Sequence, residues 1–173
     1  TVVEWALEIW WKQQVLAQLA AGRNPIRRRD SYAFAELLHA VRDNLLVDLR
    51  YDDRKYFTNW PLYLLLSYYP AIYPAPENDY RIPLLDDPRQ EPDLRVAALA
   101  RAADLSLVAY DPNAQFSQFL QGWLIQDQFI LRDPFGSPYE LLWANPYLPG
   151  LSYYSAPLVF YDPAHACLIA RSS

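Results

Sequence analysis

Prolines are concentrated in the middle of the chain, between residues 70 and 92. They are Pro70, Pro74, Pro76, Pro83, Pro88 and Pro92. A proline fixes its backbone φ angle and has no amide hydrogen to donate, so this segment cannot form an uninterrupted helix or a central β-strand. We expect it to form a connecting or wrapping loop between two helical parts of the chain.

The clearest helical pattern precedes this loop, in residues 30–51. Its apolar side chains recur at intervals of three and four residues, and Asp30 or Ser31 can cap the helix. These side chains are Phe34, Leu37, Leu38, Val41, Leu45 and Leu49. His39 lies beside this stripe without a second metal-binding residue one turn away, so we expect a core or flanking histidine rather than a metal ligand.

Two further segments before the loop are apolar but less regular. Residues 1–22 predict a helix in which Trp5 and Trp11 fall outside the apolar stripe. Residues 58–69 predict a short buried helix with Pro61 in its first turn. A buried strand is the alternative, because periodicity does not distinguish the two in a short apolar run.

After the loop, helical patterns continue and then give way to strand patterns. Residues 93–104 are rich in alanine and predict a helix, which residues 105–110 either extend or follow as a strand. Residues 111–124 predict another helix with Asp111 as its N-cap and Pro112 at its first position.

Residues 127–173 predict two β-hairpins. In the first, strands 128–133 and 139–144 flank a turn at 134–138; in the second, strands 157–162 and 167–172 flank a turn at 163–166. We therefore expect an α+β fold, in which the helical N-terminal two-thirds packs on a small antiparallel sheet of two C-terminal hairpins. A single domain of 1–173 would contain a helical part (1–69), the proline-rich loop (70–92), further helices (93–126) and the hairpins (127–173).

Charge and composition exclude several classes of function. The net charge of −5 argues against a nucleic-acid partner. No apolar run reaches the length of about 18 residues that a membrane span requires. Four scattered glycines and a single cysteine cannot build a phosphate-binding loop or a zinc site, so we expect no cofactor.

The compartment is left open by the sequence. Cys167 is alone, which fits a reducing compartment such as the cytoplasm, and no cleavable signal sequence is visible. The chain begins at Thr1 and contains no methionine, which indicates a processed or truncated product or methionines missing from the recorded sequence. If a preceding segment had been removed, a location in the cell envelope would also fit.

An aromatic-rich stretch, residues 143–154, is the best candidate for a binding surface. Aromatic rings with amide and hydroxyl neighbours suit a sugar, a proline-rich peptide or a protein partner. The candidate ligand-binding residues are Trp143, Asn145, Tyr147, Tyr153 and Tyr154. The alternative is that these rings cover the open face of the preceding hairpin and belong to the core.

Candidates for catalysis and anion binding are fewer. Asp127, Asp133 and Glu140 could form the carboxylate pair of a glycosidase near Trp123 and Trp143. His165 and Cys167 would share one face of a strand, although a lone cysteine there is more often an inert buried thiol. The arginines at 27–29 could bind an anion, whereas a solvated loop is the simpler interpretation. The arginines are Arg27, Arg28 and Arg29.

Residues 133–143, "DPFGSPYELLW", resemble the Asp-Pro-aromatic-Gly-x-Pro-Tyr segment of the major pseudopilins of type II secretion. The matching positions are Asp133, Pro134, Gly136, Pro138 and Tyr139, with Phe135 in place of the usual tryptophan. The resemblance implies a hairpin followed by a calcium-binding loop, to which Asp133 would belong. Only Glu140 and Asp162 are acidic after Asp133, fewer than a calcium site requires, so the residues themselves predict no metal.

Taken together, these patterns favour a non-enzymatic binding or interaction module of bacterial type that uses its C-terminal aromatic loop. A structural part of a cell-envelope or secretion assembly is one version of this hypothesis, and its partner would be a protein or a carbohydrate. The alternative is a hydrolase with a glycosidase-like carboxylate pair in an aromatic cleft. Nothing in the sequence indicates an oligomeric state.

Overall fold

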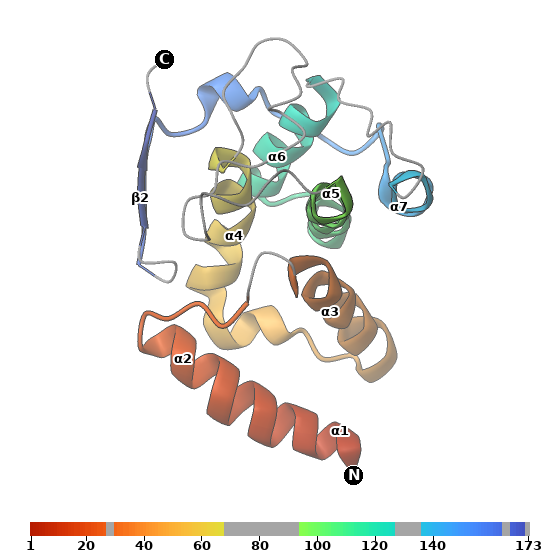
Figure 1. The fold of residues 1–173 in the computed structure, drawn as a ribbon, viewed down its shortest axis with the longest axis vertical. Helices are drawn as coiled ribbons and strands as arrows, with labels where there is room; N and C mark the ends of the chain where they lie inside the picture. The colour runs from red at the N-terminus through yellow and green to blue at the C-terminus, as the bar shows by residue number, and fades with distance from the viewer. Residues whose placement is uncertain (27–29, 68–93, 127–135, 164–166, 172–173) are drawn as a thin grey trace.

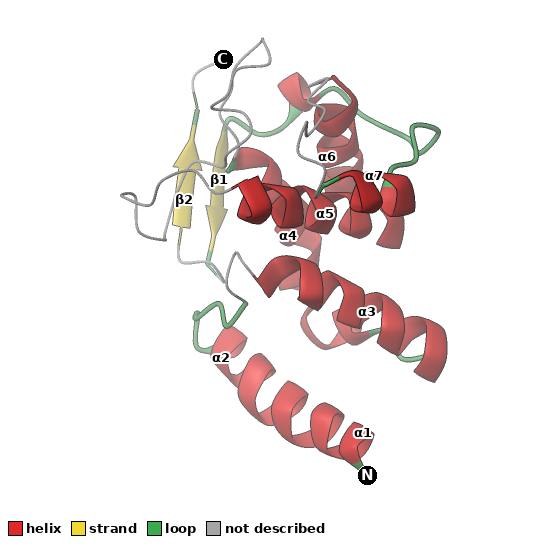
Figure 2. Ribbon diagram, turned by 45° about the vertical axis from the view of Figure 1, so that its right-hand side comes forward, coloured by secondary structure: helices red, strands yellow, loops and turns green. Residues whose placement is uncertain are grey.

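The fold is α+β, as the sequence predicts: helices dominate, and a two-stranded antiparallel sheet lies near the C-terminus (Figures 1 and 2). The computed structural model describes residues 1–26, 30–67, 94–126, 136–163 and 167–171. The predicted proline-rich loop at 70–92 lies outside this part of the chain. No helix among the described residues is long and apolar enough to cross a membrane.

The N-terminal segment forms one continuous helix made of three stretches. These are α1 (Val2–Glu4), the π-helical η1 (Trp5–Leu16) and α2 (Ala17–Ala20). Trp11, predicted to fall outside the apolar stripe, is 1% exposed and packs between Phe34 and Phe57. The buried side chains of this helix follow at intervals of four, so they lie along one side of it. They are Trp11, Val15 and Leu19.

The next helices form as predicted, with small changes at their ends. Helix α3 (Ser31–Leu45) is followed by its C-cap residue Leu46, whose φ angle of 56° is left-handed and ends the helix. A 3-10 turn, η3 (Leu49–Asp53), leads into α4 (Arg54–Leu66), which confirms the helical interpretation of this segment. Because the Asp53 side chain caps α4 at its first turn, the helix begins earlier than predicted. Pro61 therefore lies inside α4 rather than in its first turn.

Helices α5 (Leu94–Tyr110) and α6 (Gln115–Gln126) complete the helical part. Residues 105–110 extend α5 and do not form a strand. Helix α3 packs against α5, and α4 packs against α6. One apolar cluster joins the N-terminal helix, α3 and α4 around Trp11, Phe34 and Trp60, and a second joins α4, α5 and α6 to the C-terminal segment around Leu120 and Trp123.

The second predicted hairpin is confirmed. Strands β1 (Val159–Asp162) and β2 (Cys167–Ala170) pair antiparallel, with Phe160 opposite Ile169 and Tyr161 opposite Leu168. Phe160 belongs to the second apolar cluster and Ile169 packs against it, so this face of the hairpin is turned toward the helices. The hairpin lies along one side of the molecule (Figures 1 and 2).

The prediction of a first hairpin is wrong in its second strand, 139–144. Residues 137–143 form helix α7 (Ser137–Trp143), and residues 128–133, the other predicted strand, lie outside the described residues. Pro138 occupies the first turn of α7, where its fixed φ angle favours helix initiation. Glutamate and leucine, which follow it, are good helix formers. The short 3-10 turn η5 (Tyr153–Ser155) then connects to β1.

Candidate functional site

The predicted aromatic loop divides its rings: Tyr153 and Tyr154 lie 4.1 Å apart between centroids, whereas the Trp143 ring packs on His39. The Trp143 ring lies 4.6 Å from the His39 ring, and its Nε1 donates a hydrogen bond to the Tyr32 hydroxyl at 3.4 Å. Tyr153 is buried and meets the Trp123 ring edge-on at 4.7 Å between centroids. These two predicted binding residues therefore contribute to packing between the C-terminal segment and the helices.

The other three predicted ligand-binding residues are at the surface. Tyr147 is 93% exposed and Tyr154 is 61% exposed. Asn145 organises the turn that carries Tyr147: its Oδ1 accepts from the Tyr147 amide at 3.0 Å, and its carbonyl oxygen accepts from Gln121 Nε2 at 2.9 Å. Only Tyr147 and Tyr154 thus retain rings that a partner could contact.

A second apolar surface lies on the outer face of the β1–β2 hairpin. Side chains alternate between the two faces of a strand, and residues directly opposite one another share a face. Tyr161 and its cross-strand neighbour Leu168 are 65% and 66% exposed, and Val159 lies beside them at 64%. We call Val159, Tyr161 and Leu168 the outer hairpin face. Within the described residues the sheet has two strands only, so each strand also has an unpaired edge.

The remaining predicted site residues are placed as follows. Glu140 lies on α7 and forms an ion pair with Arg101 of α5. Asp127, Asp133, His165 and the arginines Arg27, Arg28 and Arg29 lie outside the described residues. The structure places the backbone of Cys167 in β2, opposite Asp162. Among the residues described, no group of three or more His, Cys, Asp or Glu side chains could hold a metal ion.

His39 is a buried core residue, as expected. Its Nε2 lies 3.0 Å from the Ser106 carbonyl oxygen, and its Nδ1 lies 3.2 Å from Arg42 Nη2. A carbonyl oxygen only accepts, so Nε2 carries the proton and Nδ1 accepts from Arg42. Both ring nitrogens are therefore already used within the fold.

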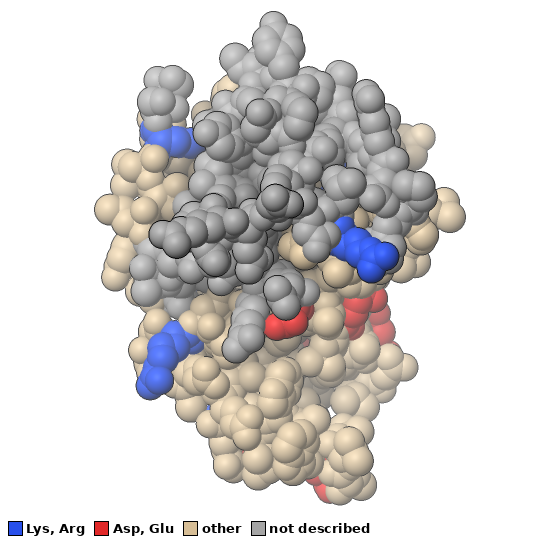
Figure 3. Space-filling view, in the orientation of Figure 1, with Lys and Arg blue, Asp and Glu red and all other residues tan. Residues whose placement is uncertain are grey.

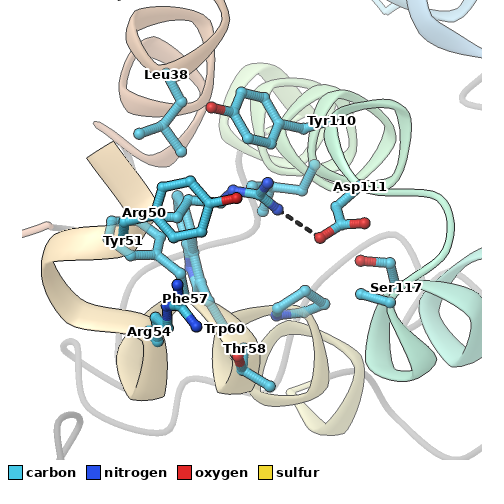
Figure 4. Close-up of a pocket in the computed structure, with 13 residues that line it drawn as sticks. Leu38, Arg50, Tyr51, Arg54, Phe57, Thr58, Trp60, Tyr110, Asp111 and Ser117 are labelled. Carbon is cyan, nitrogen blue, oxygen red and sulfur yellow. Dashed lines mark hydrogen bonds and ion pairs between the residues drawn. The ribbon is translucent and has the colours of Figure 1, made fainter. Parts of the chain in front are cut away.

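Sequence reasoning missed a cavity of about 230 Å³ between η3, the first turns of α4, the end of α5 and the start of α6 (Figure 4). We call it the α4–α6 pocket. Its apolar lining consists of Leu38, Phe57, Trp60, Pro61, Leu107 and Ala114. Its polar lining consists of Arg50, Arg54, Thr58, Asp111 and Ser117, together with the rings of Tyr51 and Tyr110.

Arg50 connects two carboxylates at one wall of this pocket. Its Nη1 donates to Asp111 Oδ2 at 2.5 Å, and its Nη2 donates to Asp48 Oδ2 at 2.8 Å. Burial by itself would raise the pKa of Asp48, but the hydrogen bonds and charge of Arg50 outweigh it and hold the pKa of this carboxyl below its usual value. Burial likewise opposes the charge of Arg50, yet its two carboxylates raise the pKa of the guanidinium. The charge of Arg50 is thus compensated within the fold.

Tyr110 packs between two guanidinium groups. The Cζ atoms of Arg42 and Arg50 lie 4.0 Å and 4.5 Å from the centroid of its ring. Its hydroxyl donates to Asp48 Oδ1 at 3.2 Å. Burial, followed by the negative charge of Asp48, raises the pKa of Tyr110 to about 12, so the hydroxyl stays a donor at neutral pH.

One part of the prediction at this wall was wrong. Asp111 was expected to cap the following helix, but α6 begins at Gln115 and the Asp111 carboxylate instead binds Arg50 of η3. The alternation of acidic and basic residues at 48–54, "DLRYDDR", was the available signal of a charged cluster. It does not identify Asp111 as the partner, because the two residues are 61 positions apart.

Charged side chains do not gather on the face seen in Figure 3. Where that face is described, blue and red atoms lie in small separate groups.

The pseudopilin resemblance of residues 133–143 stays a prediction, since the described part of this segment is Gly136 and helix α7. Comparison of the whole chain with protein-family models, curated proteins and solved structures found no match.

Proposed function

We propose that the protein is a non-enzymatic interaction module that binds a protein partner through its C-terminal hairpin. The observation that carries this proposal is the outer hairpin face, where Val159, Tyr161 and Leu168 are each about two-thirds exposed. Exposed apolar side chains that lie together on one flat surface are typical of interaction sites. Their arrangement on a strand pair suits an extended peptide segment of the partner.

The outer strand edges, which pair with no other strand in the described part of the chain, support the same proposal. A two-stranded sheet leaves amide and carbonyl groups along its outer edges, and an extended segment of another protein can add to such an edge as a further strand. The added strand would satisfy these groups, and its alternate side chains would contact the outer hairpin face. Because this face is mainly aliphatic and offers few hydrogen-bonding groups, a protein fits it better than a carbohydrate.

The loop that carries Tyr147 and Tyr154 is the second candidate for the contact surface. Tyr147 is almost fully exposed, and its backbone is held by Asn145, so its ring is presented on an ordered turn.

The hydrolase alternative has less support. Glu140, its one described carboxylate, is engaged by Arg101, and Trp143 is packed against His39.

Photo-crosslinking from position 161 tests the proposal. We expect a photoreactive phenylalanine analogue in place of Tyr161 to capture one protein partner in the organism that makes the chain. Tyr51 is the matched control position, because it is also a tyrosine and is likewise 65% exposed, but lies on η3. Crosslinks of equal pattern from both positions, or none from position 161, would contradict the proposal. Crosslinks from position 147 alone would place the contact in the aromatic loop instead.

The double variant Tyr161→Ser, Leu168→Ser should lose the partner without losing the fold. Both side chains are largely exposed, so the free energy of unfolding should change by less than about 1 kcal/mol. The crosslinked product formed from position 159 should disappear at the same time. Urea unfolding of the purified variant provides the stability measurement, and a large loss of stability would show that these side chains serve the fold rather than a partner.

A further inference from the structure

The α4–α6 pocket has the size and lining of a site for a small ring compound. An apolar cavity of about 150 Å³ is sufficient for benzene, and this pocket measures about 230 Å³. It can therefore take one six-membered ring with small polar substituents. Phe57, Trp60 and Leu107 provide the apolar wall against which such a ring would pack.

Arg54 places an uncompensated positive charge at this pocket. Its Cζ lies 4.7 Å from the centroid of the Tyr51 ring, which orients the guanidinium. Among the described residues it has no carboxylate partner, whereas Arg50 at the same pocket binds both Asp48 and Asp111. Thr58 follows one helical turn later and also lines the pocket. A guanidinium next to a hydroxyl is suited to a carboxylate.

Ser117 adds a hydroxyl group to the polar lining at the other end of the pocket. It is 1% exposed as a residue and lies in the lining of the pocket. Figure 4 shows it beside Asp111, across the pocket from Arg54. A serine hydroxyl both donates and accepts, so it could bind a polar group on a molecule in the pocket.

The end of the pocket that contains Ser117 favours a hydrogen-bond donor on the ligand, because Asp111 also lies there. Arg50 binds its Oδ2 atom, and within the described residues Oδ1 has no hydrogen-bond partner. A ligand hydroxyl placed here could donate to Oδ1 and accept from Ser117. The pocket is thus positive at the end of Arg54 and negative at the end of Asp111.

From these observations we propose that the α4–α6 pocket binds a small hydroxylated aromatic carboxylate. Its carboxylate contacts Arg54 and Thr58, its ring packs on Phe57 and Trp60, and its hydroxyl binds Asp111 and Ser117. This site is separate from the outer hairpin face and does not depend on the function proposed above.

Calorimetric titration of the purified chain with 4-hydroxybenzoate tests this inference. We expect saturable binding with one site, and binding at least tenfold weaker for 4-hydroxybenzyl alcohol, which has the same ring and hydroxyl but no charge. No binding of 4-hydroxybenzoate at millimolar concentration would overturn the proposal. Equal affinity for the neutral alcohol would overturn the assignment of an anion site.

Three variants localise the site. Arg54→Gln should weaken binding of 4-hydroxybenzoate by about tenfold or more, because it removes the charge that the carboxylate contacts. Lys55→Gln is the matched control: it removes the same charge from the same turn of α4 at an exposed residue outside the pocket lining, and should leave binding unchanged. If both variants weakened binding equally, the loss would come from the net charge of the protein. That result would contradict the proposed contact between Arg54 and the carboxylate.

Ser117→Ala tests the contact with the ligand hydroxyl separately from the contact with the carboxylate. We expect it to weaken binding of 4-hydroxybenzoate about three- to tenfold, and to leave binding of benzoate, which lacks the hydroxyl, unchanged. Equal weakening of both compounds would contradict the proposed orientation. Circular dichroism spectra and melting temperatures of the variants verify that each one is folded.

Discussion

Replacing Gly122 by alanine should lower the free energy of unfolding by about 2–3 kcal/mol, through overpacking and a lost hydrogen bond. In an ordinary helix interior the same change stabilises a protein by about 1 kcal/mol. Gly122 lies inside α6, where the backbone of Leu151 crosses it closely: an added Cβ atom would lie 1.8 Å from the Leu151 carbonyl oxygen. Because the obstacle is backbone, the connection between α7 and η5 would have to move.

This movement would also break a defined hydrogen bond. The Leu151 amide donates to the Gln118 carbonyl oxygen of α6 at 2.9 Å and so holds the connection on the helix. We therefore expect the Leu151 amide to lose its protection from hydrogen exchange in the Gly122→Ala variant. Urea unfolding and amide exchange measured by NMR check the two parts of the prediction.

Gly22→Ala provides the matched control for this variant. Gly22 has a φ angle of 70°, but an added Cβ atom would meet its nearest neighbour at an ordinary 3.6 Å. Its substitution should cost about 1–2 kcal/mol, from the left-handed backbone conformation alone, and leave exchange at Leu151 unchanged. A Gly122→Ala variant as stable as the wild type would refute the close approach of the two backbones.

Sequence reasoning succeeded where local signals agreed with one another. Residues 31–45 combine a regular apolar stripe with a polar residue at the start, and α3 forms there. It failed at residues 137–143 because the turn-forming residues Gly136 and Pro138 suit the start of a helix as well as a hairpin. Trp11 was misplaced for another reason: the helix has apolar side chains on more than one side, and the buried side is the one that meets Phe34 and Phe57.

The α4–α6 pocket could not be predicted in the same way. Its lining comes from α3, η3, α4, α5 and α6, and no local pattern brings these segments together. In the aromatic loop, by contrast, residues that are close in the sequence differ in their surroundings. Trp143, Tyr147, Tyr153 and Tyr154 are neighbours in the sequence, yet two pack against other helices and two are exposed. Burial of an aromatic ring depends on which surface lies opposite, and the sequence alone does not specify that surface.

Asp48→Asn should destabilise the protein by about 2–3 kcal/mol at pH 7, since it removes the charge of a carboxylate that binds both Arg50 and Tyr110 and leaves Arg50 paired with Asp111 alone. Asp48 accepts from the Arg50 amide at 3.0 Å, from the Arg50 guanidinium and from the Tyr110 hydroxyl. Asparagine has nearly the same shape and can still cap η3, so the variant removes mainly the charge. Thermal unfolding should show a melting temperature lower by about 5–10 °C.

The pH dependence of this difference provides the sharper test. Arg50 holds the pKa of Asp48 below its value of about 3.9 in an unfolded chain, so the carboxylate stabilises the fold fully at pH values above about 4. This contribution is lost as the pH falls through the lowered pKa of the folded state. The difference in unfolding free energy between wild type and Asp48→Asn should therefore be constant from pH 7 to about pH 5 and shrink below about pH 4.

Asp43→Asn is the matched control for this measurement. Asp43 also pairs with an arginine, Arg42, at 2.8 Å, but its side chain is 57% exposed, where solvent screens the interaction. We expect little change in stability from this substitution at any pH. If Asp43→Asn and Asp48→Asn were equally mild, the Arg50 cluster would contribute no more than an exposed ion pair. The wall of the α4–α6 pocket would then lack the rigidity that a preformed ligand site requires, because Asp48 fixes both Arg50 and the Tyr110 hydroxyl.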